Sequence, residues 1–212
     1  MKTPYDRIAE AWHAGPRAFT AQKYVDLLAG RLEPGAGVLD LGCGTGEPVA
    51  RYLVEKGFRV VGVDESAAML EIARRVVPEA QFIRADMCEL ELDERFAAAV
   101  AWDSLFHVER GRHHTVFQKL SALLSPGGRL LLSAGGTGHA GFTSEMHGHT
   151  FFYSAHDPAE TLRLLASAGF EVELCEEDDP SSKGHLAIVA RKTAGPSPGR
   201  MDSLLTAERA TP

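Results

Sequence analysis

A short apolar run that ends in three closely spaced glycines constrains this chain more than any other feature. The run spans residues 38–41, and Gly42, Gly44 and Gly46 follow it. Glycines directly after a strand let the backbone turn tightly and approach a ligand closely, while the helix that follows offers free N–H groups. The feature therefore predicts a strand, a ligand-binding turn and a helix.

Strand-like and helix-like patterns alternate along the rest of the chain. Short apolar runs that predict further strands lie at residues 59–63, 81–84, 97–102 and 129–133. Strands that alternate with helices favour a mostly parallel sheet with both faces covered. Two last runs, at residues 171–175 and 185–190, have no helix between them and predict an antiparallel pair at one edge.

The spacing of the three glycines separates two classes of ligand. A dinucleotide fingerprint reads G-x-G-x-x-G, and its last glycine packs the helix against the sheet. Here the spacing is G-x-G-x-G, and Glu47 occupies the position of that last glycine. Because an acid there repels a pyrophosphate, the spacing opposes a nicotinamide-dependent oxidoreductase and favours a ligand without phosphates.

Composition and charge are those of one acidic globular domain. The chain has 212 residues, of which 44% are apolar and 24% charged, and its formal charge is −7. A nucleic-acid binder usually shows a basic stripe, because phosphate contacts supply most of its affinity. No run of Lys and Arg occurs here. A nucleic-acid substrate is therefore disfavoured.

The cysteines and the hydropathy indicate a cytoplasmic location. Cys43, Cys88 and Cys175 are odd in number and widely spaced, which favours reduced thiols. The chain starts without a signal-peptide core, and no stretch is apolar enough to span a bilayer. We expect no membrane association and either a monomer or a homodimer.

The motif Asp40-x-Gly42-x-Gly44-x-Gly46 after a strand resembles the first motif of the class I S-adenosylmethionine-dependent methyltransferases. The resemblance covers nearly all of residues 5–192 and is greatest to the small-molecule branch, similar to the ubiquinone and menaquinone biosynthesis methyltransferases. It implies an α/β fold with a Rossmann-like seven-stranded sheet in the order 3-2-1-4-5-7-6, the last strand antiparallel.

The resemblance also divides the chain into segments. Residues 1–192 would form the methyltransferase domain, with residues 1–33 as a helical lid. The lid contains Tyr5-Asp6-Arg7-Ile8-Ala9-Glu10-Ala11-Trp12, which resembles the Tyr-Asp-x-x-Ala-x-x-Tyr opening of the small-molecule relatives, with Trp12 in place of the second tyrosine. Residues 193–212 are rich in Ala, Gly, Pro, Ser and Arg, and we expect a disordered tail.

By the same resemblance, S-adenosylmethionine would lie along the glycine turn. Its methionine part would be bordered by Asp40, Gly42, Gly44 and Gly46. Asp86 and Met87, after the third strand, correspond to the adenine site of the family. Trp102 ends the fourth strand and is a candidate wall beside the positively charged sulfur, because an aromatic face attracts a cation.

Asp64 ends the second strand and is the candidate ribose ligand. A carboxylate at this position can accept hydrogen bonds from both ribose hydroxyls, as the acid does in dinucleotide-binding folds. The alternative is an acid that belongs to the start of a helix capped by Ser66. The sequence leaves both roles open.

Two histidines are candidate bases on the acceptor side. His107 follows the fourth strand, and His149 lies in the segment 135–156, which reads as a long aromatic loop. A base is needed only if the acceptor atom holds its proton firmly, and either histidine can equally be a wall or a solvated loop residue. His147 and His149 lack further ligands for a zinc ion, so we predict no metal.

We compare three hypotheses of different class against these features. The first is an enzyme that transfers a methyl group to O, N or C of a small organic acceptor. The second is a non-catalytic S-adenosylmethionine-binding regulatory module, which would have no open acceptor cavity. The third is the nicotinamide-dependent oxidoreductase that the glycine spacing opposes.

Overall fold

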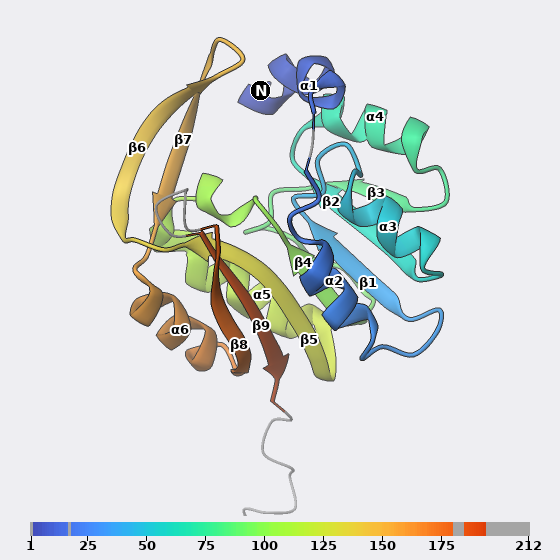
Figure 1. Ribbon diagram of the computed structural model, residues 1–212, viewed down its shortest axis with the longest axis vertical. Helices are drawn as coiled ribbons and strands as arrows, with labels where there is room; N and C mark the ends of the chain where they lie inside the picture. Colours follow the sequence, from blue (N-terminus) through green and yellow to red (C-terminus); the bar gives the residue numbers. More distant parts are fainter. Residues whose placement is uncertain (1, 17, 180–184, 194–212) are drawn as a thin grey trace, which may run out of the picture.

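A seven-stranded sheet in the order β3-β2-β1-β4-β5-β9-β8 forms the centre of the molecule (Figure 1). The computed structural model describes residues 2–16, 18–179 and 185–193. The sheet strands are β1 (Gly37–Leu41), β2 (Arg59–Asp64), β3 (Gln81–Arg84), β4 (Phe96–Ala101), β5 (Leu124–Gly135), β8 (Phe170–Asp179) and β9 (His185–Lys192). Strands β1 to β5 pair in parallel, and β9 runs antiparallel to both β5 and β8.

This order confirms the strand order that the family resemblance implies. When strands β6 and β7, which form a separate two-stranded sheet, are set aside, β8 and β9 become the sixth and seventh strands. The order 3-2-1-4-5-7-6 follows, with the last strand antiparallel. The two final strands lie at one edge, as predicted from the absence of a helix between them.

Helices cover both faces of the sheet, and alternate residues of each strand point to opposite faces. Leu39 and Leu41 belong to one buried cluster with α5 (His113–Leu123) and α6 (Pro158–Ser167). Val38 belongs to a second cluster, with α2 (Gln22–Ala29), α3 (Val49–Glu55) and α4 (Ala67–Val76). Burial on both faces explains why β1 reads as a nearly continuous apolar run.

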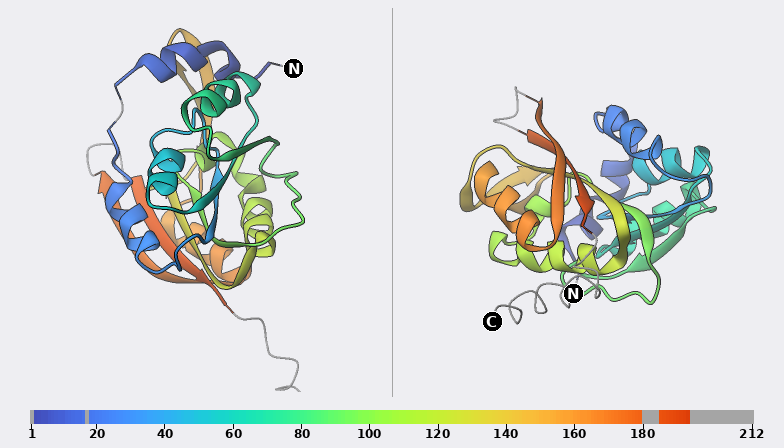
Figure 2. Two further views of the ribbon diagram at one scale, coloured as in Figure 1. Left: turned by 90° about the vertical axis from the view of Figure 1, so that its right-hand side faces the viewer. Right: turned by 90° about the horizontal axis from the view of Figure 1, so that it is seen from below.

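Capping residues fix where the helices begin. Ser66 caps α4 by accepting a hydrogen bond from the Met69 N–H, as the sequence suggested, and Asp157 caps α6 by accepting one from the Glu160 N–H. The first helix, α1 (Pro4–Ala14), begins with a reciprocal capping box between Thr3 and Asp6. Figure 2 shows α1 lying beside α4 at one end of the molecule.

The expectation of a long loop over residues 135–156 is wrong. The segment forms an antiparallel hairpin of β6 (His139–Met146) and β7 (His149–Ala155). Its two-residue turn is His147-Gly148, with φ angles of 50° and 73°. Two consecutive residues in the left-handed region are the turn geometry that matches the twist of paired strands. The hairpin packs against α1 and against the short helix η1 (Leu105–His107).

Two further expectations concern the end of the chain and the bilayer. From residue 194 onward, the tail expected at residues 193–212 lies outside the described residues. Within the described part of the chain, no helix combines the length and the apolar character that crossing a membrane requires.

Candidate functional site

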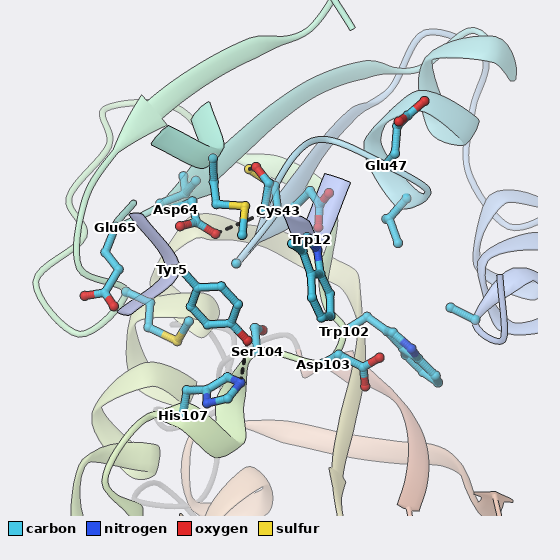
Figure 3. A pocket seen from close by; sticks show the side chains of 18 of the residues that line it. Tyr5, Trp12, Cys43, Glu47, Asp64, Glu65, Trp102, Asp103, Ser104 and His107 are labelled. Carbon is cyan, nitrogen blue, oxygen red and sulfur yellow. Dashed lines mark hydrogen bonds between the residues drawn. The ribbon is translucent and has the colours of Figure 1, made fainter. Parts of the chain in front are cut away.

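A cavity of about 510 Å³ opens at the carboxyl ends of the parallel strands (Figure 3). Its walls come from the glycine turn, from the ends of β2, β3 and β4, and from α1 with the segment that follows it. Ligands bind at this edge in open α/β sheets, because the connecting loops and helix N-termini meet there. Figure 3 shows Tyr5 and Trp12 of α1 lying over the cavity.

Each of the three positions in the turn requires glycine for a different physical reason. All have positive φ: 78° at Gly42, 52° at Gly44 and 78° at Gly46. A Cβ at Gly42 would lie 2.2 Å from the Cβ of Ser104, whereas a Cβ at Gly44 would meet no protein atom within 4 Å. A Cβ at Gly46 would press on Phe82, and Gly46 is absent from the cavity wall. Gly42 and Gly44 therefore lie at the cavity, and Gly46 serves the packing of the turn.

The Asp64 carboxylate lines the cavity and bonds both to the glycine turn and to the start of α4. Its Oδ2 accepts a hydrogen bond from the Gly44 N–H at 2.9 Å, and its Oδ1 accepts one from the Ser66 N–H at 2.8 Å. Burial raises the pKa of this carboxyl, and the two backbone N–H groups act against that rise. Each carboxylate oxygen can accept a second hydrogen bond, so both oxygens keep capacity for ligand hydroxyls.

Asp40 is buried beneath the turn with an unsatisfied oxygen. Its side chain is 3% exposed, and its Oδ2 has no hydrogen-bond partner among the described residues. Burial, and then the nearby Asp64, raise the pKa of Asp40 to about 7. A buried polar atom without a partner is costly, and its presence at a cavity wall is consistent with a ligand group that completes the site.

Replacing Asp40 by Asn is expected to raise the free energy of unfolding at pH 8 and to change it little at pH 4. A carboxyl with a higher pKa in the folded chain binds its proton more tightly there, so stability falls as the pH rises from about 4 to about 7. Asn carries no such proton. We expect D40N to gain on the order of 4 kcal/mol at pH 8, because the pKa rises from its ordinary value of 3.8 to about 7 and each pKa unit is worth about 1.4 kcal/mol.

Urea unfolding of both proteins at several pH values checks this expectation. The difference between wild type and D40N cancels the contribution of titrating groups that do not interact with Asp40. A difference that is the same at pH 4 and pH 8 would show that Asp40 is not the buried acid described.

The expected adenine residues, Asp86 and Met87, line the cavity after the end of β3. Asp86 Oδ1 accepts a hydrogen bond from the Cys88 N–H at 2.7 Å, and its Oδ2 lies 3.4 Å from the Arg112 guanidinium. Trp102 lines the cavity from the end of β4, with a buried indole N–H that has no partner among the described residues.

A tyrosine of α1 and a histidine after β4 form a hydrogen-bonded pair inside the cavity. The Tyr5 hydroxyl lies 2.7 Å from His107 Nε2, and His107 Nδ1 lies 3.0 Å from the Phe152 carbonyl oxygen. A carbonyl only accepts, so Nδ1 carries the proton and Nε2 accepts from the tyrosine. Burial lowers the pKa of His107 and raises that of Tyr5, which keeps both groups neutral near pH 7.

Polar and apolar contacts fasten α1 over the cavity. Asp6 Oδ1 accepts hydrogen bonds from the Ser66 hydroxyl at 2.7 Å and the Ala68 N–H at 3.1 Å. A small buried cluster joins α1, α4 and β7 through Ile8, Ala9, Met69, Ile72 and Phe151. The N-terminus of α4 thus receives a carboxylate from α1, a favourable arrangement at the positive end of a helix.

The structure brings most of the predicted site residues together and leaves two apart. Gly46 and His149 do not line the cavity, and His149 sits at the tip of the β6–β7 hairpin. The cavity wall includes the other candidates, namely Asp40, Gly42, Gly44, Asp64, Asp86, Met87, Trp102 and His107.

Sequence reasoning missed Asp103 and Arg112 as wall residues. Asp103 follows Trp102 directly, at the same edge of the sheet as Asp64, and this position was the available signal. Arg112 comes from the turn before α5, and nothing in the sequence pattern marks it.

The fold and the cavity together define a class of protein. The molecule combines a seven-stranded sheet of this order with a glycine turn whose spacing differs from the dinucleotide fingerprint, and with an acid at the end of β2. These features form a binding site suited to an adenosyl ligand. The open space at Gly44, the spare capacity of Asp64 and the unpartnered oxygen of Asp40 fit S-adenosylmethionine.

Comparison with known proteins agrees with that class. Residues 38–128 match the family model described as "Methyltransferase domain". This part of the chain is therefore similar to the methyltransferase domains of that family. The trans-aconitate 2-methyltransferase of Paracidovorax citrulli is 36% identical over 96 residues, which are 45% of this chain and 37% of that protein. The chain thus spans well under half the length of this curated relative.

Two solved structures extend the likeness to nearly the whole chain. The CcbJ methyltransferase from Streptomyces caelestis superposes with a TM-score of 0.75 at 20% identity, covering 91% of this chain and 99% of that one. The 1,6-didemethyltoxoflavin-N1-methyltransferase from Burkholderia thailandensis has a TM-score of 0.69 at 26% identity, covering 90% and 84%. The latter structure holds its substrate and S-adenosylhomocysteine.

Proposed function

We propose that this protein transfers a methyl group from S-adenosylmethionine to O, N or C of a small organic acceptor. One observation carries the proposal: a single cavity is lined both by the glycine turn with Asp64 and by a group of aromatic side chains. A binding site for the donor alone would not need the second part. The aromatic wall is formed by Tyr5, Trp12, Phe19 and Trp102.

The residues of the cavity bind, orient and exclude water. When bound, S-adenosylmethionine supplies a methyl group on a positively charged sulfur, which departs as a neutral thioether when the acceptor's lone pair bonds to the methyl carbon. Asp64 and Asp86 would hold the ribose and the adenine, and the Gly42 and Gly44 backbone would border the methionine part. Alignment of the acceptor supplies most of the catalysis in such a transfer.

The lid role of the N-terminal segment is part of the proposal. Residues 1–33 would cover the bound donor within a domain of residues 1–192. The contacts of Asp6 with α4 and of Tyr5 with His107 support this, because they tie α1 to two elements that line the cavity. Exchange of ligand would then require these contacts to open.

The alternative is a non-catalytic S-adenosylmethionine-binding regulatory module. It predicts binding of the donor without turnover and without an open acceptor part, and the size of the cavity argues against it. An assay of S-adenosylhomocysteine release against a panel of small acceptors distinguishes the two. Tight donor binding with no release above the acceptor-free rate across the panel would favour the module.

His107 is proposed as the base on the acceptor side. Its neutral Nε2 accepts a hydrogen bond from the Tyr5 hydroxyl inside the cavity, so it can take the hydroxyl proton while the tyrosine oxygen takes one from the acceptor. With an acceptor identified by the release assay, H107A is expected to lower kcat by about a hundredfold, the lower range of general base catalysis.

The matched variant is H149A, since His149 stays a prediction from sequence and lies outside the cavity wall. We expect H149A to retain kcat within about twofold, well below the range of a catalytic base. A larger loss in H149A than in H107A would reverse the two assignments. Y5F, which keeps the ring but removes the hydroxyl, separates a relay from simple packing.

Partners and location complete the proposal. We propose a small-molecule acceptor with no nucleic acid or membrane partner, a monomer or homodimer, and a cytoplasmic location. The acidic charge of −7 and the three free cysteines support these assignments. Size-exclusion chromatography with light scattering tests the oligomeric state.

A further inference from the structure

The cavity is lined far more by acids than by bases. Its wall contains the carboxylates of Asp40, Glu47, Asp64, Glu65, Asp86, Asp103 and Glu109. Among the residues that the structure describes, Arg112 is the one lysine or arginine in that wall, and it is shared between Asp86 and Glu89. A cleft lined by one sign of charge concentrates ligands of the opposite sign and repels others.

The carboxylate of Asp103 lies beside aromatic rings of the cavity wall. It follows β4, has φ of 51°, and its side chain is 55% exposed. Figure 3 draws Asp103 between the rings of Trp12 and Trp102, which also line the cavity. Carboxylate and aromatic faces together are the groups that hold an organic cation.

A partly buried histidine, His185, holds this carboxylate in place. His185 Nε2 lies 2.9 Å from Asp103 Oδ1, and His185 Nδ1 lies 3.3 Å from Asp178 Oδ2. The Ser133 hydroxyl also accepts a hydrogen bond from the Asp103 N–H at 2.7 Å. These contacts occupy Oδ1 and the backbone of Asp103, while no described residue bonds to Oδ2. The contact with His185 thus holds Oδ1 in place, and Oδ2 is left to accept a hydrogen bond from a ligand.

We propose that Asp103 is a specificity residue that selects acceptors carrying an ammonium or another strong hydrogen-bond donor, and that the cavity rejects anionic acceptors. The inference rests on the proposed function, since it names the class of acceptor for the same cavity. The donor group bound by Asp103 is an anchor. The atom that receives the methyl group is a separate part of the acceptor.

A charge series with one ring system tests the selection. Tryptamine, tryptophol and indole-3-acetate share the indole ring and are cationic, neutral and anionic at pH 7. Each is titrated calorimetrically into protein saturated with S-adenosylhomocysteine. We expect tryptamine to bind at least about tenfold more tightly than indole-3-acetate, as expected for gain or loss of one charged hydrogen bond. Equal affinities, tighter binding of the anion, or no binding of any member would overturn the proposal.

D103N assigns the selection to one residue. Asn tolerates the left-handed backbone of this position, so the variant should fold. We expect D103N to lose about tenfold in tryptamine affinity and to retain its affinity for tryptophol. The exposed pair of Glu91 and Lys119 provides the control E91Q, which removes one negative charge outside the cavity and should change neither affinity. An equal loss in E91Q and D103N, or loss of tryptophol binding in D103N, would overturn the assignment.

Two further measurements keep the outcomes distinct. Arg17 neighbours the wall residue Pro16 in the sequence and lies outside the described residues, so R17A is titrated in parallel. If the preference for tryptamine arises only in R17A, the wild-type cavity is not selective and the proposal fails. The affinity for S-adenosylhomocysteine is measured first. Failure to bind S-adenosylhomocysteine would contradict the proposed function. Binding of S-adenosylhomocysteine without a charge preference among the indole compounds would contradict only the proposed selection.

Discussion

A methyl group added at Gly42 is expected to destabilise the fold, whereas the same methyl group at Gly44 is expected to spare the fold and block the ligand. The Gly42 Cβ would lie 2.2 Å from the Ser104 Cβ, and Ser104 is buried with its hydroxyl bonded to the Leu41 carbonyl. Overpacking and left-handed strain together cost roughly 2–5 kcal/mol, a fall of about 10 °C in Tm for a chain of this size.

G44A meets open space inside the cavity, so only the backbone strain remains. Its stability should fall by roughly 1–2 kcal/mol, but S-adenosylmethionine affinity should fall at least about tenfold, because the methyl group occupies ligand space. The matched control is G57A, another left-handed glycine with open space, which ends α3 away from the cavity.

Thermal unfolding and calorimetric titration of the three variants separate the effects. G57A should lose stability like G44A and bind the donor like wild type. If G44A binds the donor with wild-type affinity, the glycine turn does not border the ligand. If G42A unfolds at the wild-type temperature, the contact with Ser104 is not as close as described.

Loss of the Asp64 side chain is expected to weaken S-adenosylmethionine binding by roughly 1–3 kcal/mol, the cost of leaving buried polar groups unpaired. Both carboxylate oxygens already accept backbone hydrogen bonds, so D64A also frees the Gly44 and Ser66 N–H groups. Stability and affinity should therefore fall together in D64A. A purely helix-capping role predicts the fall in stability alone.

S66A is the control that distinguishes these roles. It removes the cap of α4 and the hydroxyl that donates to Asp6, but leaves the Asp64 carboxylate in place. Capping is worth about 1 kcal/mol, so S66A should lose stability and keep most of its donor affinity. Unchanged donor affinity in D64A, measured by the same titration, would show that the ribose assignment is wrong.

The strands and the start of each capped helix could be predicted from local patterns because local signals and global fold agree, whereas the strand order came from the family resemblance. The apolar run at β1, the glycine turn and the caps at Ser66 and Asp157 each specify one conformation, and strands buried on both faces read clearly. The hairpin of β6 and β7 was missed because most of β6 is exposed and lacks apolar alternation. The His147-Gly148 pair was the one local sign of its turn.

The cofactor half of the site was more predictable than the acceptor half. Asp40, Asp64 and Asp86 end parallel strands or follow them, and the sheet alone brings such positions to one edge. The pairing of Tyr5 with His107, and of Asp103 with His185, joins residues more than 80 positions apart in the chain. No periodicity or spacing in the sequence records such contacts, which depend on how α1 and β9 pack.

The central claim is that the cavity at the glycine turn binds an adenosyl ligand without phosphates. Calorimetric titration of the purified protein with S-adenosylhomocysteine and, separately, with NAD tests it most directly. We predict saturable one-to-one binding of S-adenosylhomocysteine that weakens in D64A and G44A, and no binding of NAD. Binding of NAD, or no heat from S-adenosylhomocysteine at millimolar concentration, would contradict it.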